Sequence, residues 1–220
     1  MTNDDDRDAG LVHITAGQVT LHGNLLLPEE GRGLIVFAHG SGSSRFSARN
    51  RAVARALRAG GLGTLLLDLL TPDEEELDLH TAKYRFDIEL LAERVTDAVH
   101  WLGSEPATSR LPIGLFGAST GGGAALVAAA RMPARVKAVV SRGGRPDLAG
   151  PALPLVEAPT LLIAGGLDES VIALNEQAYA MMRCERRLEI VPGATHLFEE
   201  KGALERVALL ARDWFEQHLV

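Results

Sequence analysis

Cysteine is almost missing from the 220-residue chain, and the only one is Cys184. A single thiol excludes an internal disulfide, and no pair or cluster of cysteines is available to hold a zinc ion. We therefore expect a cytoplasmic, reducing setting and no bound metal. Cys184 lies in "MMRCERR", near a predicted helix end, and a reactive thiol requires a specific electropositive site, so we do not predict it to be a nucleophile.

Long apolar runs and an excess of positive charge are missing as well. No stretch of about 18 uninterrupted apolar residues occurs, and the acidic start "MTNDDDRDAG" has neither the positive leader nor the apolar core of a secretory signal. The formal net charge of −7 argues against nucleic acid or an anionic membrane as a partner. We expect a small-molecule partner, and a flexible acidic segment over residues 1–10.

Short apolar runs alternate with longer segments of helical spacing along the rest of the chain. This alternation predicts a single α/β domain over residues 1–220, with a mostly parallel sheet covered on both faces. Residues 11–15 and 18–28, joined by a tight "AGQ" turn, predict an antiparallel hairpin at the sheet edge. The other predicted strands are 33–40, 62–70, 111–117, 136–141, 159–166 and 188–193, and the predicted helices are 47–61, 84–103, 120–131, 170–183 and 202–218.

The segment "GLFGASTGGG" at 114–123 places one serine among glycines. Gly117, Ser119 and Gly121 fit Gly-x-Ser-x-Gly, the nucleophile elbow, in which a strained strand-to-helix turn exposes the serine hydroxyl. A glycine-rich turn can also be purely structural. Ser119 follows a predicted strand and opens a predicted helix, which is the setting that the motif requires, so the functional interpretation is favoured.

A serine hydroxyl is a weak nucleophile at neutral pH and needs a base, together with a carboxylate that orients the base. Asp168 in "GGLDESV" and His196 in "GATHLFEE" each follow a predicted strand. Because the carboxyl ends of parallel strands share one edge of a sheet, we expect both side chains to meet Ser119 there. The chain order of serine, aspartate and histidine is that of an elbow-type hydrolase.

Each of these residues also has a structural interpretation when it is taken alone. Asp168 could cap the following helix, and His196 could be a polar loop residue. Glu169, or the acidic pair at 199 and 200, could replace Asp168, which is preferred because it lies closest to its strand end. The remaining histidines apart from His39 lie in the predicted hairpin, in the acidic segment or on helices, and are weaker candidates for the base: His13, His22, His80, His100 and His218.

His39 opens "HGSGSS" directly after a predicted strand, and we assign it a different task. Attack on an ester creates an oxyanion, which backbone N–H donors stabilise by roughly 3 kcal/mol or more apiece. We expect the N–H groups of Thr120 and Ser41 to be these donors, with Gly40 and Gly42 permitting the loop conformation and the close approach. The loop lacks the lysine and the spacing of a Walker loop, so nucleotide binding is not favoured.

With "HGSG", "GASTGGG", "GGLD" and "GATH" in this order, the sequence resembles the α/β-hydrolase superfamily and is most similar to its small dienelactone-hydrolase-like members. The resemblance covers about residues 18–218. It implies a central eight-stranded, largely parallel sheet and an acyl-enzyme mechanism without a cofactor. Dienelactone hydrolases carry a cysteine nucleophile, whereas this elbow has Ser119, which puts dienelactone itself in doubt as the substrate.

These motifs predict a serine hydrolase that cleaves carboxylic esters. Ser119 would attack, His196 would transfer the proton and Asp168 would hold the imidazolium. A thioesterase, an amidase or an acyltransferase would use the same site. A non-catalytic binding module is the alternative from another class, since a fold by itself licenses no activity.

Only about 18 residues, 142–159, separate two predicted strands where many relatives in the superfamily insert a cap domain. We expect no substantial cap and a shallow pocket shaped by loops. Arg142 and Arg145 in this segment could bind a substrate carboxylate or phosphate, but a surface salt bridge to Asp147 or to the acidic pair at 199 and 200 is favoured. The acidic segment 71–80 is predicted to be a solvated loop, and Asp68 to anchor the backbone or a nearby arginine.

Overall fold

Eight strands form one sheet in the computed structural model, which describes residues 10–29 and 31–219. The order of the strands is β1-β2-β4-β3-β5-β6-β7-β8, where β2 is antiparallel to both of its neighbours and the other pairs are parallel. The sheet confirms the predicted α/β class. The flexible start predicted over residues 1–10 lies, apart from Gly10, outside the described residues. The strands are β1 (Leu11–Ala16), β2 (Val19–Leu26), β3 (Leu34–Ala38), β4 (Gly63–Leu67), β5 (Ile113–Ala118), β6 (Val136–Arg142), β7 (Thr160–Gly165) and β8 (Arg186–Val191).

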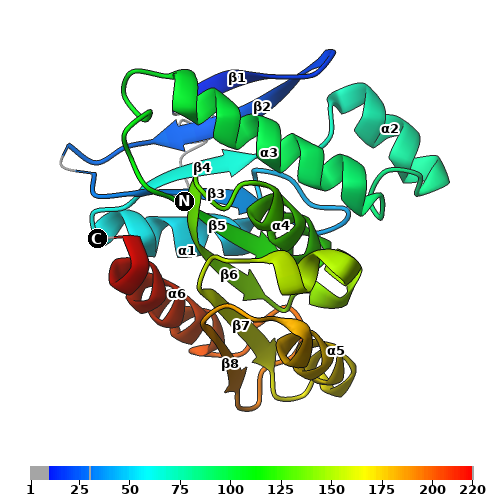
Figure 1. Cartoon of the computed structure of the whole chain (residues 1–220). Coiled ribbons are helices and arrows are strands. Elements are labelled where there is room, and N and C mark those ends of the chain that lie inside the picture. Colours follow the sequence, from blue (N-terminus) through cyan, green and yellow to red (C-terminus); the bar gives the residue numbers. More distant parts are fainter. Residues whose placement is uncertain (1–9, 30, 220) are drawn as a thin grey trace.

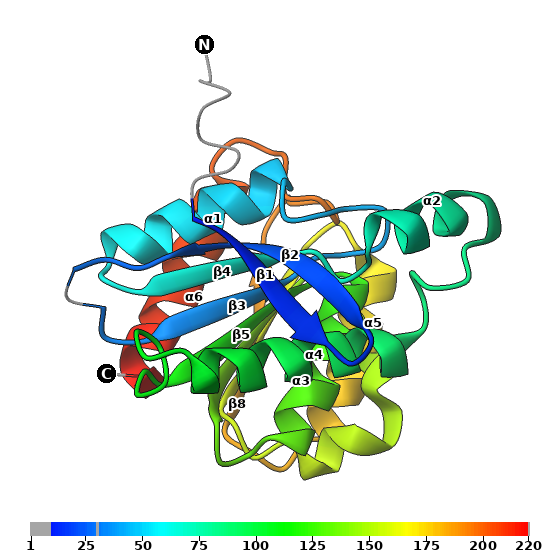
Figure 2. The ribbon, with the colours of Figure 1, turned by 90° about the horizontal axis from the view of Figure 1, so that it is seen from above.

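Helices cover both faces of the sheet (Figures 1 and 2). α1 and α6 pack on one face, and α3, α4 and α5 pack on the other, so that the sheet separates two apolar cores. A short 3-10 helix, η2 (Pro146–Leu155), fills the segment in which no cap domain was expected. The α-helices are α1 (Ala48–Ala59), α2 (Pro72–Thr81), α3 (Ile88–Ser104), α4 (Thr120–Arg131), α5 (Glu169–Met181) and α6 (Ala203–Leu219).

The burial of each strand follows its sequence pattern. Every residue of β3, β4, β5 and β7 is buried, as the unbroken apolar runs predict for strands covered on both faces. β1 and β8 lie at the two edges of the sheet and are partly exposed. β8 carries three charged side chains, which are typical of an open sheet edge.

The acidic segment 71–80 is a helix, α2, so the prediction of a solvated loop was wrong. Thr71 accepts a hydrogen bond from the Glu74 N–H at 3.2 Å, and the Glu74 carboxylate accepts one from the Thr71 N–H at 2.8 Å. This capping box, followed by Pro72 in the first turn, starts the helix. The helix was missed because it carries no apolar stripe, although the cap itself was readable in the sequence.

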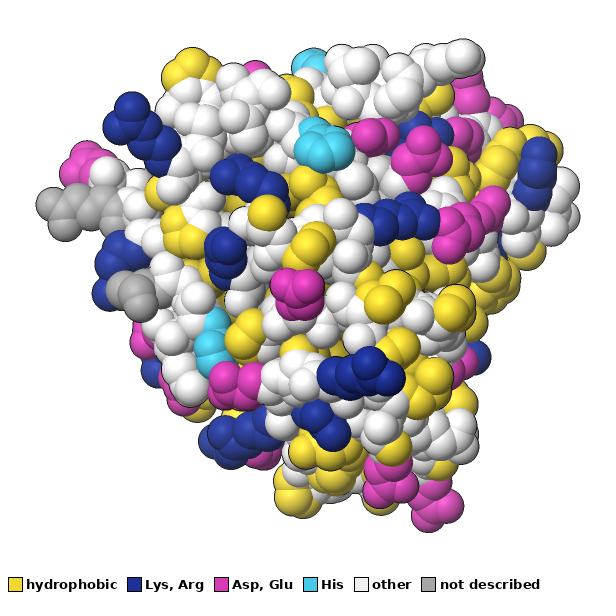
Figure 3. All heavy atoms as spheres, in the orientation of Figure 1, with side chains coloured by type: hydrophobic (Ala, Val, Ile, Leu, Met, Phe, Trp, Pro, Cys, Tyr) yellow, Lys and Arg dark blue, Asp and Glu magenta, His cyan; other side chains and the backbone are white. Residues whose placement is uncertain are grey.

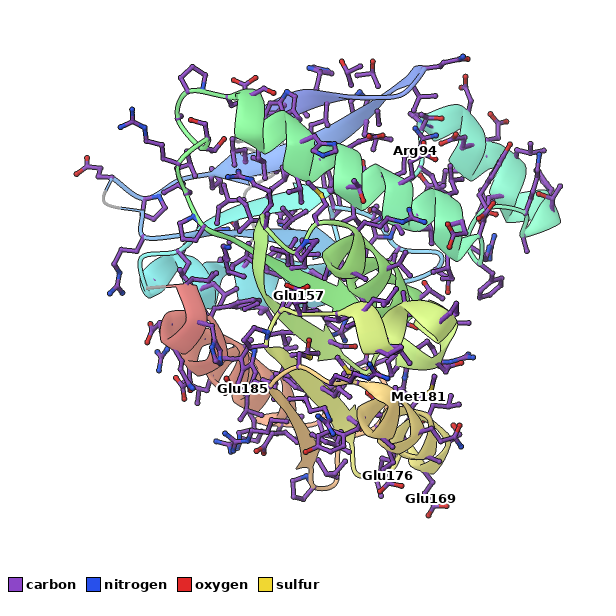
Figure 4. The ribbon with its side chains drawn as sticks, in the orientation of Figure 1. Arg94, Glu157, Glu169, Glu176, Met181 and Glu185 are labelled. Carbon is purple, nitrogen blue, oxygen red and sulfur yellow. The ribbon has the colours of Figure 1, made fainter. Side chains whose placement is uncertain are left out.

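Arg94 holds α2 against the rest of the fold. Its guanidinium group is buried and donates to the Ala16 carbonyl at 2.9 Å and to the Glu74 carboxylate at 3.0 Å. Figure 4 shows Arg94 on α3, beside α2. One side chain therefore connects α3, the end of β1 and the start of α2.

The order of the strands creates a crevice at the carboxyl end of β3. The chain leaves β3 through α1 to reach β4 on one side, and later returns to β5 on the other side. Ligands of open α/β sheets bind where the order of the strands reverses in this way. The loop after β3 and the turn after β5 are therefore the segments in which a site is expected.

Charged side chains of both signs are interspersed over the face shown in Figure 3. The net charge of −7 is therefore not gathered into one acidic patch on this face. None of the helices in the described part of the chain is both long and apolar enough to cross a membrane.

Phe116 provides a test of the core beneath this crevice. Its ring is fully buried in β5 and lies 4.8 Å from the ring of Phe37, measured between centroids. We expect Phe116→Ala to lower the free energy of unfolding by about 3–5 kcal/mol, because a cavity replaces the ring. Urea denaturation measures this change. The control Leu79→Ala, at an exposed position, should change stability by less than about 0.5 kcal/mol, and a similar loss for both variants would contradict the assignment.

Candidate active site

Ser119 occupies the sharp turn between β5 and α4. Its backbone has φ 51° and ψ −124°, a conformation that non-glycine residues rarely adopt. The turn is held from both sides: the Ser119 N–H donates to the Arg142 carbonyl at 3.3 Å, and the Ser119 carbonyl accepts from Arg145 N–H at 3.0 Å. The strained strand-to-helix turn that the elbow motif describes is therefore present.

The two glycines of the motif are required by close backbone contacts. A Cβ at Gly117 would collide with the Gly121 carbonyl, and a Cβ at Gly121 would collide with the Ala38 carbonyl at the end of β3. The elbow and the end of β3 are thus pressed together with no room for a side chain. This contact fixes the position of Ser119 relative to the loop that follows β3.

Asp168 and His196 are joined by a hydrogen bond of 2.7 Å between the aspartate Oδ2 and the histidine Nδ1. Asp168 occupies the N-cap position of α5, yet its side chain makes no capping bond. Its other oxygen accepts a bond from the Ser170 hydroxyl at 3.3 Å. The Asp168 side chain therefore does not cap the helix, and its carboxylate lies where it can orient the imidazole.

The alternative carboxylates are engaged elsewhere. Glu169 is exposed and points away from the molecule at the start of α5 (Figure 4). Glu199 pairs with Arg49 at 2.9 Å, and Glu200 accepts a hydrogen bond from the Thr195 hydroxyl at 2.6 Å. None of these three carboxylates contacts the imidazole of His196.

Ser119 and His196 line one pocket of about 230 Å³ at the carboxyl edge of the sheet. No hydrogen bond joins their side chains among the described residues, and catalytic hydrogen bonds often tighten only when a substrate is bound. Ser41, Arg142 and Leu197 also line this pocket. The serine, the histidine and the loop after β3 therefore share one space, although they come from distant parts of the sequence.

The loop after β3 lies directly against the serine. A Cβ at Gly40 would lie 2.9 Å from the Cβ of Ser119, so only glycine fits this approach. Gly42 has open space around it but a φ of +66°, so its glycine is needed for conformation instead. Ser41 and Thr120 together line a second pocket. Thr120 is the first residue of α4, so its backbone N–H has no acceptor within the helix.

His39 ties this loop to the chain segment after β4. Its Nδ1 donates to the Gly40 carbonyl at 2.9 Å, and its Nε2 accepts from the Leu69 N–H at 3.0 Å. These two bonds fix a neutral tautomer. Burial lowers the pKa of His39, and the bond to Gly40 opposes this only in part. His39 is therefore a positioning residue, and this tie between two loops could not be seen in the sequence.

Asp68 anchors the far end of the same loop, as predicted. It accepts a bond from the Arg45 N–H at 2.6 Å and pairs with the Arg45 guanidinium group. The same guanidinium group donates to Asn24 Oδ1 at 3.1 Å. The loop is thus attached to β2 and to the end of β4.

Arg142, the last residue of β6, and Arg145, three residues later, have different environments. Arg145 makes two bonds to the Asp147 carboxylate, at 2.8 and 2.7 Å, which confirms the salt bridge that was favoured for it. For Arg142 the same interpretation was wrong: within the described residues it has no carboxylate partner and makes one long bond of 3.4 Å to Asn50. Burial and the neighbouring Arg49 lower the pKa of Arg142 to about 10.

No group of three or more His, Cys, Asp or Glu side chains that could hold a metal ion occurs in residues 10–29 and 31–219. Burial raises the pKa of the Cys184 thiol, which makes it a poorer nucleophile at neutral pH. Ser119 is thus the nucleophile candidate with a histidine beside it in the same pocket.

Comparisons with known proteins give matches in sequence and in fold. Residues 31–218 match the family described as the dienelactone hydrolase family. A crystal structure of a dienelactone hydrolase from Anabaena variabilis is 58% identical in sequence, covers 96% of this chain and 97% of that chain, and superposes with a TM-score of 0.94. Est1E from Butyrivibrio proteoclasticus, solved with ferulic acid bound, is 18% identical over 94% of this chain and 98% of that chain with a TM-score of 0.76, which shows a shared fold.

A curated relative from Mycobacterium tuberculosis carries the provisional name phosphoribosyl transferase. It is 58% identical over 208 residues, which cover 94% of this chain and 46% of the relative. The chain therefore spans about half the length of the curated relatives that it matches.

The lowered pKa of His39 predicts how acid affects the fold. Below about pH 6.5 the unfolded chain takes up a proton at this histidine that the folded chain does not, so the free energy of unfolding should fall as the pH decreases from about 7 to 5. Replacing His39 with Gln should remove part of this decline in urea unfolding at several pH values. The control His100→Gln removes an exposed histidine and should preserve the decline. Equal declines in the wild type and in His39→Gln would contradict the assignment.

Proposed function

The chain belongs to the dienelactone hydrolase family, and on this premise we propose that it is a serine hydrolase that cleaves carboxylic esters through an acyl-enzyme intermediate. One observation carries the proposal: a carboxylate lies 2.7 Å from the Nδ1 of a histidine that shares a pocket with a serine held at φ 51°. A nucleophile, a base and a group that orients the base are the parts that acyl transfer requires.

The first half of the proposed reaction acylates Ser119. His196 accepts the hydroxyl proton at Nε2 while Ser119 Oγ attacks the ester carbonyl carbon, and Asp168 stabilises the imidazolium that forms. The imidazolium then gives its proton to the leaving alkoxide as the bond from carbon to the leaving oxygen breaks. The products are an alcohol and an ester of Ser119.

The second half releases the acid. Water loses a proton to His196 and attacks the acyl carbon, and the proton returns to Ser119 Oγ when the acyl bond breaks. In both halves the carbonyl oxygen becomes an oxyanion, which the N–H groups of Ser41 and Thr120 would stabilise. The contact of Gly40 with Ser119 and the position of Thr120 at the start of α4 support this assignment.

Other acyl transfers would use the same residues. A thioesterase or an amidase differs in the leaving group, and an acyltransferase differs in the acceptor. Competition between water and an added alcohol for the acyl group separates hydrolysis from transfer. The phosphoribosyl transferase name of the Mycobacterium tuberculosis relative belongs to a protein of which this chain matches 46%, so the name does not indicate the activity of this chain.

A fluorophosphonate probe tests the nucleophile. We expect the native protein to be labelled once, at Ser119, because an activated serine is required for the reaction. Ser119→Ala should remove both the labelling and ester hydrolysis, and Asp168→Asn should lower kcat by about 10⁴-fold. Mass spectrometry locates the label, and circular dichroism checks that each variant is folded.

Ser109→Ala is the control for this experiment, since Ser109 lies before β5, away from the pocket. Its labelling and activity should equal those of the wild type. A folded native protein that resists the probe, or ester hydrolysis that survives Ser119→Ala, would refute the proposal.

The pH dependence of the rate tests the base. The imidazole must be neutral to accept a proton, so kcat/KM for an uncharged ester should climb through roughly pH 6 to 8. His218→Gln, on α6, should leave the shape of the profile unchanged. A profile that stays flat over this range would show that His196 is not the base.

A further inference from the structure

The guanidinium group of Arg142 is buried without an anionic partner. Its residue is 6% exposed, its Nε has no hydrogen-bond partner among the described residues, and its one side-chain hydrogen bond is the long contact with Asn50. The Phe198 ring lies 5.8 Å from the guanidinium carbon, measured to the ring centroid, but an aromatic ring does not neutralise the charge. Removing a cation from water without an anionic partner is costly. Arg142 nevertheless lines the pocket that holds Ser119 and His196, where a ligand could supply the missing negative charge.

Arg49 adds a second guanidinium group to the same pocket. One of its terminal nitrogens pairs with Glu199 at 2.9 Å, and its Nε is buried without a partner in the described part of the chain. Arg49 and Arg142 repel each other, which contributes to the lowered pKa of Arg142. Two like charges held beside one pocket favour a ligand that carries more than one negative charge.

The amino end of α1 strengthens this positive field. Ser47 caps the helix, and Ser47, Arg49 and Asn50 line the pocket. The first turn contains no acidic residue that would offset the positive end of the helix dipole. Helix amino ends of this kind bind phosphate and similar anions.

No aspartate or glutamate is among the described residues that line the pocket. Asp168 is engaged with His196, and Glu199 offsets one of the two arginines only in part because it is largely exposed. A carboxylate would bring one negative charge, whereas a phosphate monoester brings about 1.5 to 2 near pH 7 and three oxygens for guanidinium donors.

We propose that Arg142, Arg49 and the amino end of α1 form a subsite for a phosphate monoester, so that the substrates are carboxylic esters that also carry a phosphate group. Phosphate binding at this subsite does not depend on catalysis. That the bound phosphate belongs to an ester substrate rests on the ester hydrolysis proposed above. Arg145 lies three residues from Arg142, but its guanidinium group is satisfied by Asp147, so it has no part in the subsite.

Binding of inorganic phosphate to the Ser119→Ala protein tests the subsite without any need for catalysis. Titration calorimetry at constant ionic strength should show one phosphate per chain, bound at least tenfold more tightly than acetate. Arg142→Gln should weaken phosphate binding at least tenfold, and the matched control Arg145→Gln should leave it unchanged.

Thermal unfolding without ligand separates this role from a structural one. Removal of an unpaired buried charge should leave the Tm of Arg142→Gln equal to or above that of the wild type, whereas loss of a structural salt bridge would lower it. In the native protein, phosphate but not acetate should slow labelling of Ser119 by the fluorophosphonate probe, which tests the subsite without a substitution at Arg142.

The subsite is refuted if phosphate does not bind, if acetate binds as tightly as phosphate, or if Arg142→Gln leaves phosphate affinity unchanged. Failure of the ester hydrolase proposal has a different signature, because phosphate would still bind to Ser119→Ala while the native protein resisted the probe. Loss of phosphate binding in a protein that the probe still labels would overturn the subsite alone.

Discussion

The close backbone contact between the elbow and the end of β3 is the constraint on which the candidate site depends. A Cβ at Gly121 would collide with the carbonyl of Ala38, and a Cβ at Gly40 would collide with Ser119, so neither position tolerates a side chain. These contacts place the nucleophile candidate against the loop whose amides would hold the oxyanion. The strand order makes them possible, because β3 and β5 are parallel neighbours whose carboxyl ends meet at one edge. His39 and Asp68 then hold the loop in place from its two ends.

The features that could be predicted from the sequence are those that depend on local pattern. Buried strands have unbroken apolar runs, and the elbow has glycines wherever its turn requires them. Asp168 and His196 could be placed because the carboxyl ends of parallel strands converge. The helix α2 was missed, since a helix that buries only one residue, Asp78, has no apolar stripe to reveal it.

Other features depend on which partner a side chain finds in three dimensions. Arg142 and Arg145 lie three residues apart and have the same chemistry, yet one is paired with Asp147 and the other is buried beside the pocket. Nothing in the local sequence distinguishes them. The two hydrogen bonds by which His39 joins two loops are equally hidden in the sequence, because Leu69 is thirty residues away in the chain.

The net charge of −7 and an anion subsite are compatible because they act over different distances. Charges spread over the surface are screened by salt over about 10 Å, whereas two guanidinium groups and a helix amino end act at contact in a partly buried pocket. The net charge therefore acts weakly at the pocket, where one phosphate would meet mainly the two arginines. Ser119 at a positive φ and Arg142 buried without a carboxylate each break a local rule of stable folding, and both residues line the same pocket. Features that lower stability and lie in one pocket indicate a surface shaped for a ligand. If stability alone determined the sequence, each of them could be removed by a separate substitution.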